Sequence, residues 1–180
     1  MAEKVLVAYA SKYGATAQIA ENIALRLKKA GLDAEAKDVK EVKDIRNYSA
    51  VLLGSGVYAG NWLKEAADFL IANQEELAKR PVWFFSDGPT GDGDPVERMK
   101  GWRFPDALKP IANKVKPRDI AFFHGVLEID KLRFAEKMII RALKAPVGDF
   151  RDWEMINSWV DGVTKALKTN PGFGELENRR

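Results

Sequence analysis

Cysteine is absent from the 180-residue chain, which excludes disulfide bonds, thiolate metal sites and cysteine-bound iron–sulfur clusters. His124 is the only histidine, so a metal site built from several histidines is also excluded. No apolar run approaches the roughly eighteen residues that a membrane-spanning helix needs. The net charge of +3 is small, so we expect no nucleic-acid partner. A chain without cysteine suits a reducing compartment, and we expect a cytoplasmic location.

What the chain does contain indicates one domain. Hydrophobic residues make up 46% of it, which is enough for one full core. The sequence has no internal repeat, no low-complexity segment and no linker-like stretch. We therefore expect a single domain over residues 1–168, followed by a polar and frayed tail over 169–180.

Short apolar runs alternate with amphipathic segments along the chain. The apolar runs, and one edge-like segment of alternating charge and alanine, predict strands at 4–10, 33–39, 50–54, 82–85 and 120–123. The amphipathic segments predict a first helix that opens at 15 or 16 and ends before Gly31, and further helices at 62–78, 106–115, 132–144 and 152–167. This alternation predicts the α/β class, as a doubly wound, five-stranded parallel sheet in the order 2-1-3-4-5 with helices on both faces.

Such a sheet binds ligands beyond the carboxyl ends of its strands, where the winding reverses between strands one and three. The loops after the first, third and fourth strands should therefore converge; they are 11–16, 55–62 and 86–94. The first loop turns directly from a strand into a helix, whose free N–H groups and dipole attract anions. The hydroxyl groups of Ser11 and Thr16 can donate to phosphate oxygens, and Gly14 allows close approach. The same kind of turn is also common without a ligand.

The second loop, Ser55-Gly56-Val57-Tyr58-Ala59-Gly60-Asn61-Trp62, offers two glycines and two aromatic residues. It is not a dinucleotide fingerprint, because the glycine spacing is one residue too long, no helix starts at the turn, and no acidic residue stands where a ribose would be bound. Two interpretations remain open. Either Tyr58 or Trp62 stacks on a planar heterocycle, or Trp62 packs the following helix against the core.

The third loop, Ser86-Asp87-Gly88-Pro89-Thr90-Gly91-Asp92-Gly93-Asp94, is acidic and rich in glycine. A calcium loop is excluded because Val96 stands where the next oxygen ligand belongs and no closing glutamate follows at the right distance. The loop is either part of a polar active site or a simple connector.

Several of these segments resemble the flavodoxin family. The motif Ser11-x-x-Gly14-x-Thr16 and the run from Tyr48 to Ser55 carry the resemblance. The segments 137–141 and 148–153, which read Lys-Met-Ile-Ile-Arg and Gly-Asp-Phe-Arg-Asp-Trp, narrow it to the flavodoxin-type menaquinone-dependent protoporphyrinogen IX dehydrogenases and the flavodoxin-domain proteins grouped with them. The resemblance covers nearly the whole chain.

The resemblance implies one FMN with its phosphate on the first loop and its ring between the other two. The implied phosphate site is Ser11, Lys12, Tyr13, Gly14, Ala15 and Thr16. The implied ring site is Ser55, Gly56, Val57, Tyr58, Ala59, Gly60 and Trp62, with Ser86, Asp87, Gly88, Pro89, Thr90 and Gly91. In the porphyrinogen enzymes an Arg and a His tend to accompany the tyrosine of the second loop, whereas here Val57 precedes Tyr58 and Ala59-Gly60-Asn61 follows it.

Two functions fit this resemblance. One is an FMN-dependent oxidoreductase that passes electrons from a reduced, protoporphyrinogen-like substrate to a quinone or another acceptor. The other is an electron carrier that serves a redox partner protein and has no small-molecule substrate of its own. Carrier flavodoxins are usually acidic, whereas this chain has a pI near 9.0, so its partner surface should differ from theirs. The oligomeric state is left open.

Two further features have alternative interpretations. His124, at the end of the fifth strand, is the single candidate for a catalytic proton-transfer residue; otherwise its ring bonds a loop carbonyl. The helix within Lys131–Lys144 carries Arg133, Lys137 and Arg141 at a spacing of four beside an apolar surface. Such a helix either rests on an anionic membrane, at its inner face, or packs as an ordinary helix with a solvated basic side.

Overall fold

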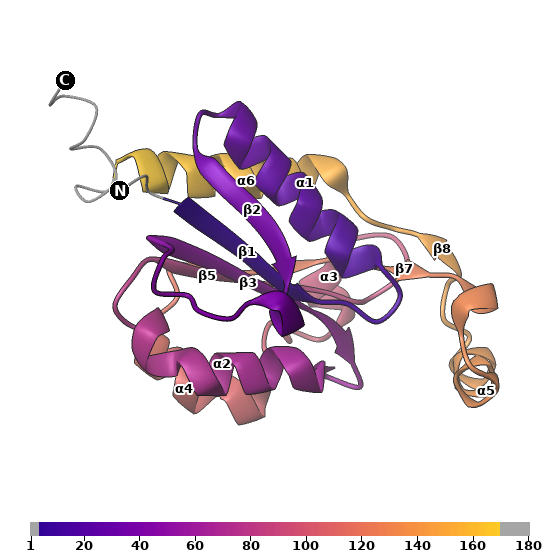
Figure 1. The fold of residues 1–180 in the computed structure, drawn as a ribbon. Coiled ribbons are helices and arrows are strands. Elements are labelled where there is room, and N and C mark those ends of the chain that lie inside the picture. Colours follow the sequence, from indigo (N-terminus) through magenta and orange to yellow (C-terminus); the bar gives the residue numbers. More distant parts are fainter. Residues whose placement is uncertain (1–3, 170–180) are drawn as a thin grey trace, which may run out of the picture.

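The computed structural model describes residues 4–169 and has a parallel sheet at its centre (Figure 1). Its strands are β1 (Lys4–Ala10), β2 (Asp33–Asp38), β3 (Ala50–Tyr58), β5 (Val82–Asp87) and β6 (Ile120–Phe123). They lie side by side in the order β2-β1-β3-β5-β6, and all four pairings are parallel. The predicted class and strand order are confirmed. Residues 170–180 of the predicted tail lie outside the described residues.

Helices cover both faces of this sheet (Figure 1). On one face are α1 (Ala15–Lys29) and α6 (Trp153–Lys168), and on the other are α2 (Lys64–Leu77) and α4 (Lys109–Val115). Because side chains alternate along a strand, β1 sends Val5 and Val7 into one core and Leu6 and Ala8 into the other. Burial on both sides explains why the central strands read as nearly continuous apolar runs.

The second loop is more ordered than the sequence indicates. Strand β3 continues to Tyr58, and the chain then reverses through Ala59 and Gly60, both at positive φ, into the short antiparallel strand β4 (Asn61–Trp62). A two-residue hairpin turn of this kind requires positive φ at both positions. Helix α2 consequently begins at Lys64 rather than at residue 62. Short helical segments complete the body: η1 (Val39–Glu41), α3 (Pro95–Arg98) and η2 (Asp106–Leu108).

An extension between β6 and α6 projects from the body, and we call residues 126–149 the arm (Figure 1). Strands β7 (Val126–Leu127) and β8 (Gly148–Asp149) pair antiparallel at its base. Beyond them lie η3 (Ile129–Lys131) and α5 (Phe134–Leu143). No residue of α5 is buried, so the interpretation of this segment as an ordinary packed helix is wrong.

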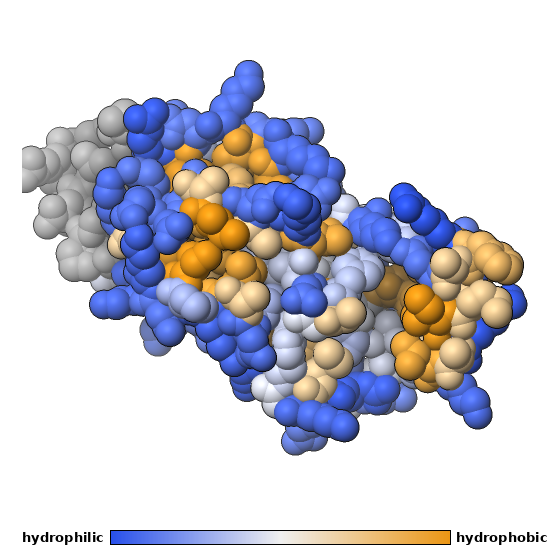
Figure 2. Space-filling model, turned by 90° about the horizontal axis from the view of Figure 1, so that it is seen from below, coloured by the Kyte–Doolittle hydropathy of each residue, from blue (hydrophilic) through white to orange (hydrophobic). Residues whose placement is uncertain are grey.

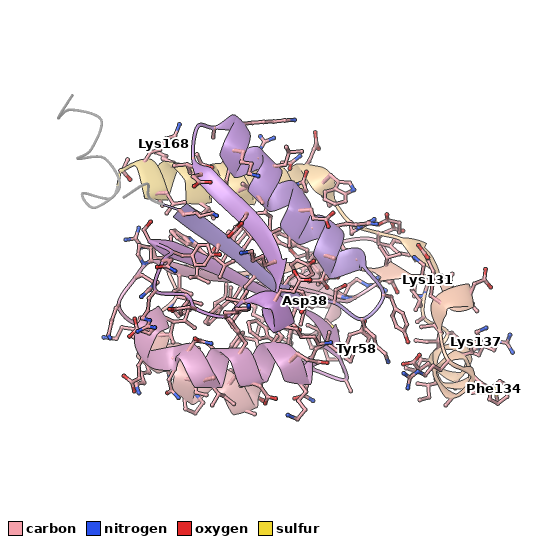
Figure 3. All side chains as sticks on the ribbon, in the orientation of Figure 1. Asp38, Tyr58, Lys131, Phe134, Lys137 and Lys168 are labelled. Atoms are coloured by element: carbon pink, nitrogen blue, oxygen red, sulfur yellow. The ribbon has the colours of Figure 1, made fainter. Side chains whose placement is uncertain are left out.

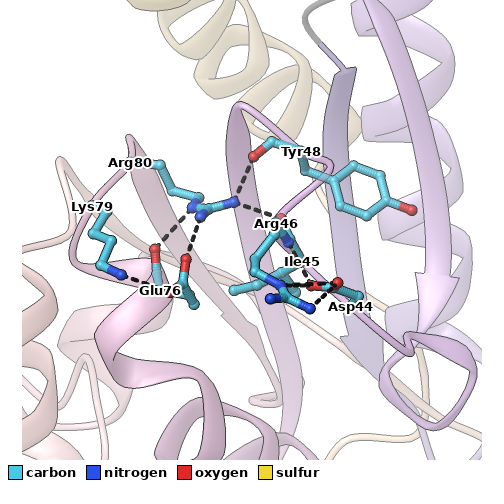
Figure 4. Close-up of polar contacts among 7 residues, drawn as sticks. All are labelled: Asp44, Ile45, Arg46, Tyr48, Glu76, Lys79 and Arg80. Carbon is cyan, nitrogen blue, oxygen red and sulfur yellow. Dashed lines mark hydrogen bonds and ion pairs between the residues drawn. The ribbon is translucent and has the colours of Figure 1, made fainter.

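A polar cluster ties the 44–48 loop to the end of α2, remote from the carboxyl ends of the strands (Figure 4). The guanidinium of Arg80 donates to the carbonyl oxygens of Ile45, at 2.5 Å, and Tyr48, at 2.7 Å. The same side chain pairs with Glu76 at 2.9 Å. These bonds satisfy carbonyls of an irregular segment that has no strand partner of its own.

Candidate functional site

The three predicted loops meet at the carboxyl ends of β1, β3 and β5, where they border a cavity of about 700 Å³. This volume lies within the range of roughly 300–1,000 Å³ that is typical of small-molecule and cofactor sites. The arm forms another wall of the cavity, through α5 and the residues on either side of it. The cavity is therefore a space shared by the sheet and the arm.

The first loop forms a candidate anion site at the start of α1. Gly14 is the N-cap, at φ 97°, and no side chain caps the helix. Within the described residues, the N–H groups of Ala15, Thr16 and Ala17 make no hydrogen bond. The Ser11 hydroxyl oxygen accepts a bond from the Gly14 N–H at 3.0 Å, so the hydroxyl proton of Ser11 stays available for a ligand. This donor set fits a phosphate group.

Thr16 and Asp87 join the first loop to the third. The Thr16 hydroxyl donates to a carboxylate oxygen of Asp87 at 2.6 Å, and both side chains border the cavity although both are buried. Burial is the largest effect on Asp87 and raises its pKa to about 7. The hydrogen bond from Thr16 and the positive charge of Arg151 act in the opposite direction and lower this pKa. The site thus contains a carboxyl group that titrates near neutral pH.

Tyr58 is the aromatic side chain of the second loop that reaches the cavity. Its ring is 41% exposed and borders the cavity at the end of the sheet that faces the arm (Figure 3). Burial of the hydroxyl group raises the pKa of Tyr58. The Lys12 ammonium group lies 5.4 Å from the centre of the Tyr58 ring and 5.1 Å from that of Tyr13. Tyr58 is therefore the aromatic residue of the second loop that a ligand in the cavity would meet.

Trp62 has a different position, and the interpretation in which it stacks on a ligand is wrong. Its ring is 5% exposed and packs edge-on against Phe84 and Phe104. The indole N–H donates to the Ser86 hydroxyl at 2.7 Å. The hairpin reverses the chain after Tyr58 and sends Trp62 into the core, so the packing interpretation is the one that the structure shows.

The predicted site residues divide into two groups. Those that border the cavity are Ser11, Tyr13, Gly14, Ala15, Thr16, Gly56, Val57, Tyr58, Ala59, Asp87, Gly88, Pro89 and Thr90. Those that do not are Lys12, Ser55, Gly60, Trp62, Ser86 and Gly91.

Each of the remaining residues outside the cavity has another role. The buried Ser55 hydroxyl donates to the Gly56 carbonyl and accepts from the Leu63 N–H, which fixes the start of α2. Gly60 forms the hairpin turn. Gly91, at φ 106°, lies beside the guanidinium of Arg98.

His124 contacts the third loop through both nitrogens of its ring. One ring nitrogen lies 3.0 Å from the Pro89 carbonyl oxygen and the other 2.6 Å from that of Gly93. The ring is 5% exposed and does not border the cavity. The interpretation of His124 as a strand-end residue bonded to loop carbonyls is the one observed, and the proposed proton transfer is not supported because both nitrogens are engaged.

Glu136 of α5 is a residue that the sequence did not single out. Its carboxylate accepts from the Lys12 ammonium group and the Tyr13 hydroxyl, both on the first loop, and from the Arg133 N–H at 2.9 Å. These bonds lower the pKa of Glu136 to about 2. We call this contact the latch, because it fastens the arm to the first loop. The two sides are 124 residues apart in the sequence, and no local pattern indicates their contact.

Arg151 is the second residue that sequence reasoning missed. It borders the cavity with its side chain only 9% exposed and forms a two-point ion pair with Asp149. It also donates to Gln18, in the first turn of α1, at 2.6 Å, and lies over the ring of Trp153. A cation is thereby held beside the anion site. The 148–153 segment carried the family resemblance, but its sequence assigned no role to the arginine.

A doubly wound parallel sheet with an open helix N-terminus at its topological switch point defines a class of proteins that bind phosphate-bearing cofactors. Residues 6–153 match the family model described as "Flavodoxin domain", and the chain belongs to this family. The family gives the cofactor as FMN and the general function as electron transfer by a flavoprotein. The donor set of the first loop fits the phosphate of FMN.

Individual proteins and solved structures are similar to this chain at low sequence identity. The chain is 23% identical, over 169 residues that cover 85% of it and 90% of the other protein, to the protoporphyrinogen IX dehydrogenase (quinone) of Escherichia coli strain K12. The two-electron reduced flavodoxin of Megasphaera elsdenii has a TM-score of 0.51 at 22% identity, over 67% of this chain and 84% of that one. Oxidised Flavodoxin 1 of Bacillus cereus has a TM-score of 0.57 at 16% identity, over 92% and 99%. These structural likenesses show the fold.

Proposed function

We propose that the chain is an FMN-dependent oxidoreductase that takes electrons from a reduced small molecule and passes them to a quinone or another acceptor. The observation that carries this proposal is the apolar wall that the arm adds to the cavity. Leu132, Ile139, Ile140 and Leu143 border the cavity opposite the three loops. An electron carrier needs only an exposed ring edge, whereas an enzyme needs room beside the ring for a second molecule.

In this proposal each loop has a separate task. The hydroxyl groups of Ser11 and Thr16 and the free N–H groups of α1 bind the phosphate. Tyr58 stacks on the ring, and the 88–90 segment supports its edge. FMN, when bound, supplies the hydride and single-electron chemistry, and the protein supplies orientation and exclusion of water.

The walls of the cavity suggest the chemistry of the substrate. Besides the apolar side chains of α5, the cavity is bordered by the cationic residues Arg98 and Lys144, and by Lys131, which is paired with Glu128. This combination suits a largely apolar molecule that carries acidic groups. A protoporphyrinogen-like substrate meets that description, and the relative from Escherichia coli that is named for this substrate and for a quinone supports the choice.

The test is steady-state turnover by the purified protein loaded with FMN. With protoporphyrinogen IX as donor and a short-chain menaquinone analogue as acceptor, we expect turnover that requires both. Ile139→Asp, which places a charge in the apolar wall, should raise the KM for the donor, whereas Met138→Asp on the other side of α5 should not. Rapid exchange of electrons with a partner protein, and no turnover of any reduced small molecule, would instead establish the carrier.

We further propose that the outer side of α5 rests on an anionic membrane, which is where a quinone would be reached. Phe134 and Lys137 point away from the body of the protein (Figure 3), and an apolar patch lies over the arm (Figure 2). Phe134 and Met138 are 79% and 52% exposed, beside Arg133 and Arg141. No helix among residues 4–169 is long and apolar enough to cross a bilayer, so the proposed contact is peripheral, at the cytoplasmic face.

A further inference from the structure

The hydroxyl group of Thr16 has one proton and two potential acceptors. That proton is donated to Asp87 in the structure, at 2.6 Å. A phosphate group bound on the first loop would be a second acceptor within reach of the same hydroxyl. A hydroxyl group donates one hydrogen bond at a time but can accept another, so Thr16 cannot donate to both anions. The conflict disappears when Asp87 carries a proton of its own, because it then donates to Thr16 and leaves the Thr16 proton for the phosphate.

We propose that Asp87 takes up one proton when FMN binds, and that the protonated carboxyl group orients the Thr16 hydroxyl toward the phosphate. The inference rests on the proposed placement of that phosphate on loop 11–16. Asp87 is then a positioning residue, acting on the cofactor through Thr16.

The surroundings of Asp87 favour its neutral form once a second anion arrives. Its register neighbours on β3 and β6 are Gly56 and Phe123, which carry no charge. The titratable or charged groups that act on it through their charge are Arg151, ahead of α6, and Tyr58, at the end of β3.

The positive charge of Arg151 acts on an ionised Asp87 but does not fully offset its burial. Arg151 is already paired with Asp149 through two hydrogen bonds, so two carboxylates share its charge. Two anions in one buried site repel each other, so a bound phosphate should raise the proton affinity of Asp87 further. Since burial already raises the pKa of Asp87 to about 7, the proton is available near neutral pH.

The consequence is a definite dependence of FMN affinity on pH. Below pH about 7, Asp87 is protonated before FMN arrives and binding needs no further proton. Above this pH, binding must take up a proton, and the affinity should fall by up to about tenfold for each pH unit. The phosphate itself titrates near pH 6, so it is fully charged in this range and adds no opposing slope.

The experiment is a calorimetric titration of the apoprotein with FMN at pH 7, 8 and 9, in two buffers of different ionisation enthalpy, which counts the protons taken up. We expect close to one proton per FMN at pH 8 to 9 and a loss of about tenfold in affinity over that unit. Asp87→Asn, whose amide can donate to Thr16 at any pH, should take up no proton and bind FMN with pH-independent affinity. The control Asp92→Asn removes an exposed charge from the same loop and should behave like the parent protein.

A titration with riboflavin, which lacks the phosphate, distinguishes failure of the proposed phosphate site from failure of the proposed role of Asp87. Riboflavin should bind more weakly than FMN and take up no proton. If FMN binds no better than riboflavin, the proposed phosphate site on loop 11–16 is wrong, and the role of Asp87 falls with it. If FMN binds better than riboflavin yet takes up no proton at pH 8 to 9, or if Asp87→Asn keeps the pH dependence, the phosphate site stands and the role of Asp87 is wrong.

Discussion

At the scale of single residues, the site separates side chains that border the cavity from neighbours that only hold the loops in place. Tyr58 and Trp62 are four positions apart and both aromatic, yet the hairpin turns one toward the cavity and the other into the core. Thr16 and Asp87 are buried but still border the cavity. Their different surroundings lead to two predictions that distinguish ligand contact from structural support.

The first prediction concerns the hydroxyl groups of the first loop. On the proposed placement of the FMN phosphate, Ser11→Ala and Thr16→Val would each remove a hydrogen bond to it, which is worth about 1.5–3 kcal/mol for a charged acceptor. We therefore expect FMN affinity to fall by about tenfold to a hundredfold in calorimetric titration, with the far-UV spectrum unchanged. Ser49→Ala, whose hydroxyl contacts the Lys4 carbonyl at the opposite end of the sheet, is the control. Wild-type affinity in both loop variants would show that the first loop does not bind the phosphate.

The second prediction contrasts the two aromatic residues. Tyr58→Leu should weaken the quenching of flavin fluorescence and cost about 0.5–1.5 kcal/mol of FMN binding, whereas Tyr58→Phe should keep both. Trp62→Phe should leave the flavin signal intact but lower the free energy of unfolding by about 1–3 kcal/mol, because the buried Ser86 hydroxyl loses its partner. Flavin fluorescence measures the effect on binding, and thermal unfolding measures the effect on stability. Loss of the flavin signal in Trp62→Phe, with no such loss in Tyr58→Leu, would contradict the placement of these rings.

At the scale of elements, the arm is the part that distinguishes this chain from a sheet with a bare cofactor loop. It contributes no buried residue through α5 and touches the first loop through the latch of Glu136, Lys12 and Tyr13. Few apolar contacts hold it, so ionic contacts have an unusually large share in fixing its position.

The third prediction is that the latch fixes the arm. Glu136→Gln should increase amide exchange of the arm, in α5 and in β7 and β8, by several-fold, whereas Glu128→Gln, an arm variant that breaks only the pair with Lys131, should not. Because the latch lowers the pKa of Glu136 from 4.5 to about 2, its contribution is complete above pH about 4.5 and is lost as the pH falls toward 2. Hydrogen-exchange mass spectrometry at pH 7 tests the variants. Equal exchange in Glu136→Gln and the parent would mean that other contacts hold the arm.

The fourth prediction concerns the outer side of α5. Arg133, Lys137 and Arg141 together should give weak binding to anionic vesicles, since each basic residue near such a surface contributes about 1 kcal/mol. The binding should fade as the Debye length shrinks from about 10 Å at 0.1 M salt to about 3 Å at 1 M. Changing the three to glutamine should abolish it and leave the flavin spectrum unchanged. Vesicle co-sedimentation at low and high salt measures this binding. Absence of binding by the parent protein at low salt would refute the membrane contact.

At the scale of the whole molecule, the sequence predicts the sheet well and the arm poorly. Strands buried on both faces are apolar almost throughout, and this pattern is visible in any short window. The paired strands of the arm have two residues each, which is too short for any periodicity, and the latch joins positions 124 residues apart. The burial of Trp62 depends on a hairpin whose turn, Ala59-Gly60, lacks the usual asparagine or aspartate signal.

The candidate site shows the same division. The first loop lies where the strand-to-helix pattern predicts it, and 13 of the 19 predicted binding positions border the cavity. Arg151 and Glu136 escaped prediction because their importance depends on the folded path of the chain, which brings the end of the arm back to the first turn of α1.

The base of the arm has one more consequence, for how such a chain can diversify. The Phe150 N–H donates to the Gly125 carbonyl oxygen at 3.1 Å, so the chain leaves the body and returns to it at adjacent points. A segment that leaves and returns at adjacent points can be lengthened, shortened or replaced while the sheet keeps its position, provided that the replacement retains Asp149, the ion-pair partner of Arg151. The arm is in this sense an insertion with a closed base, and on the proposed function a change in its length or sequence would alter which molecules the cavity admits.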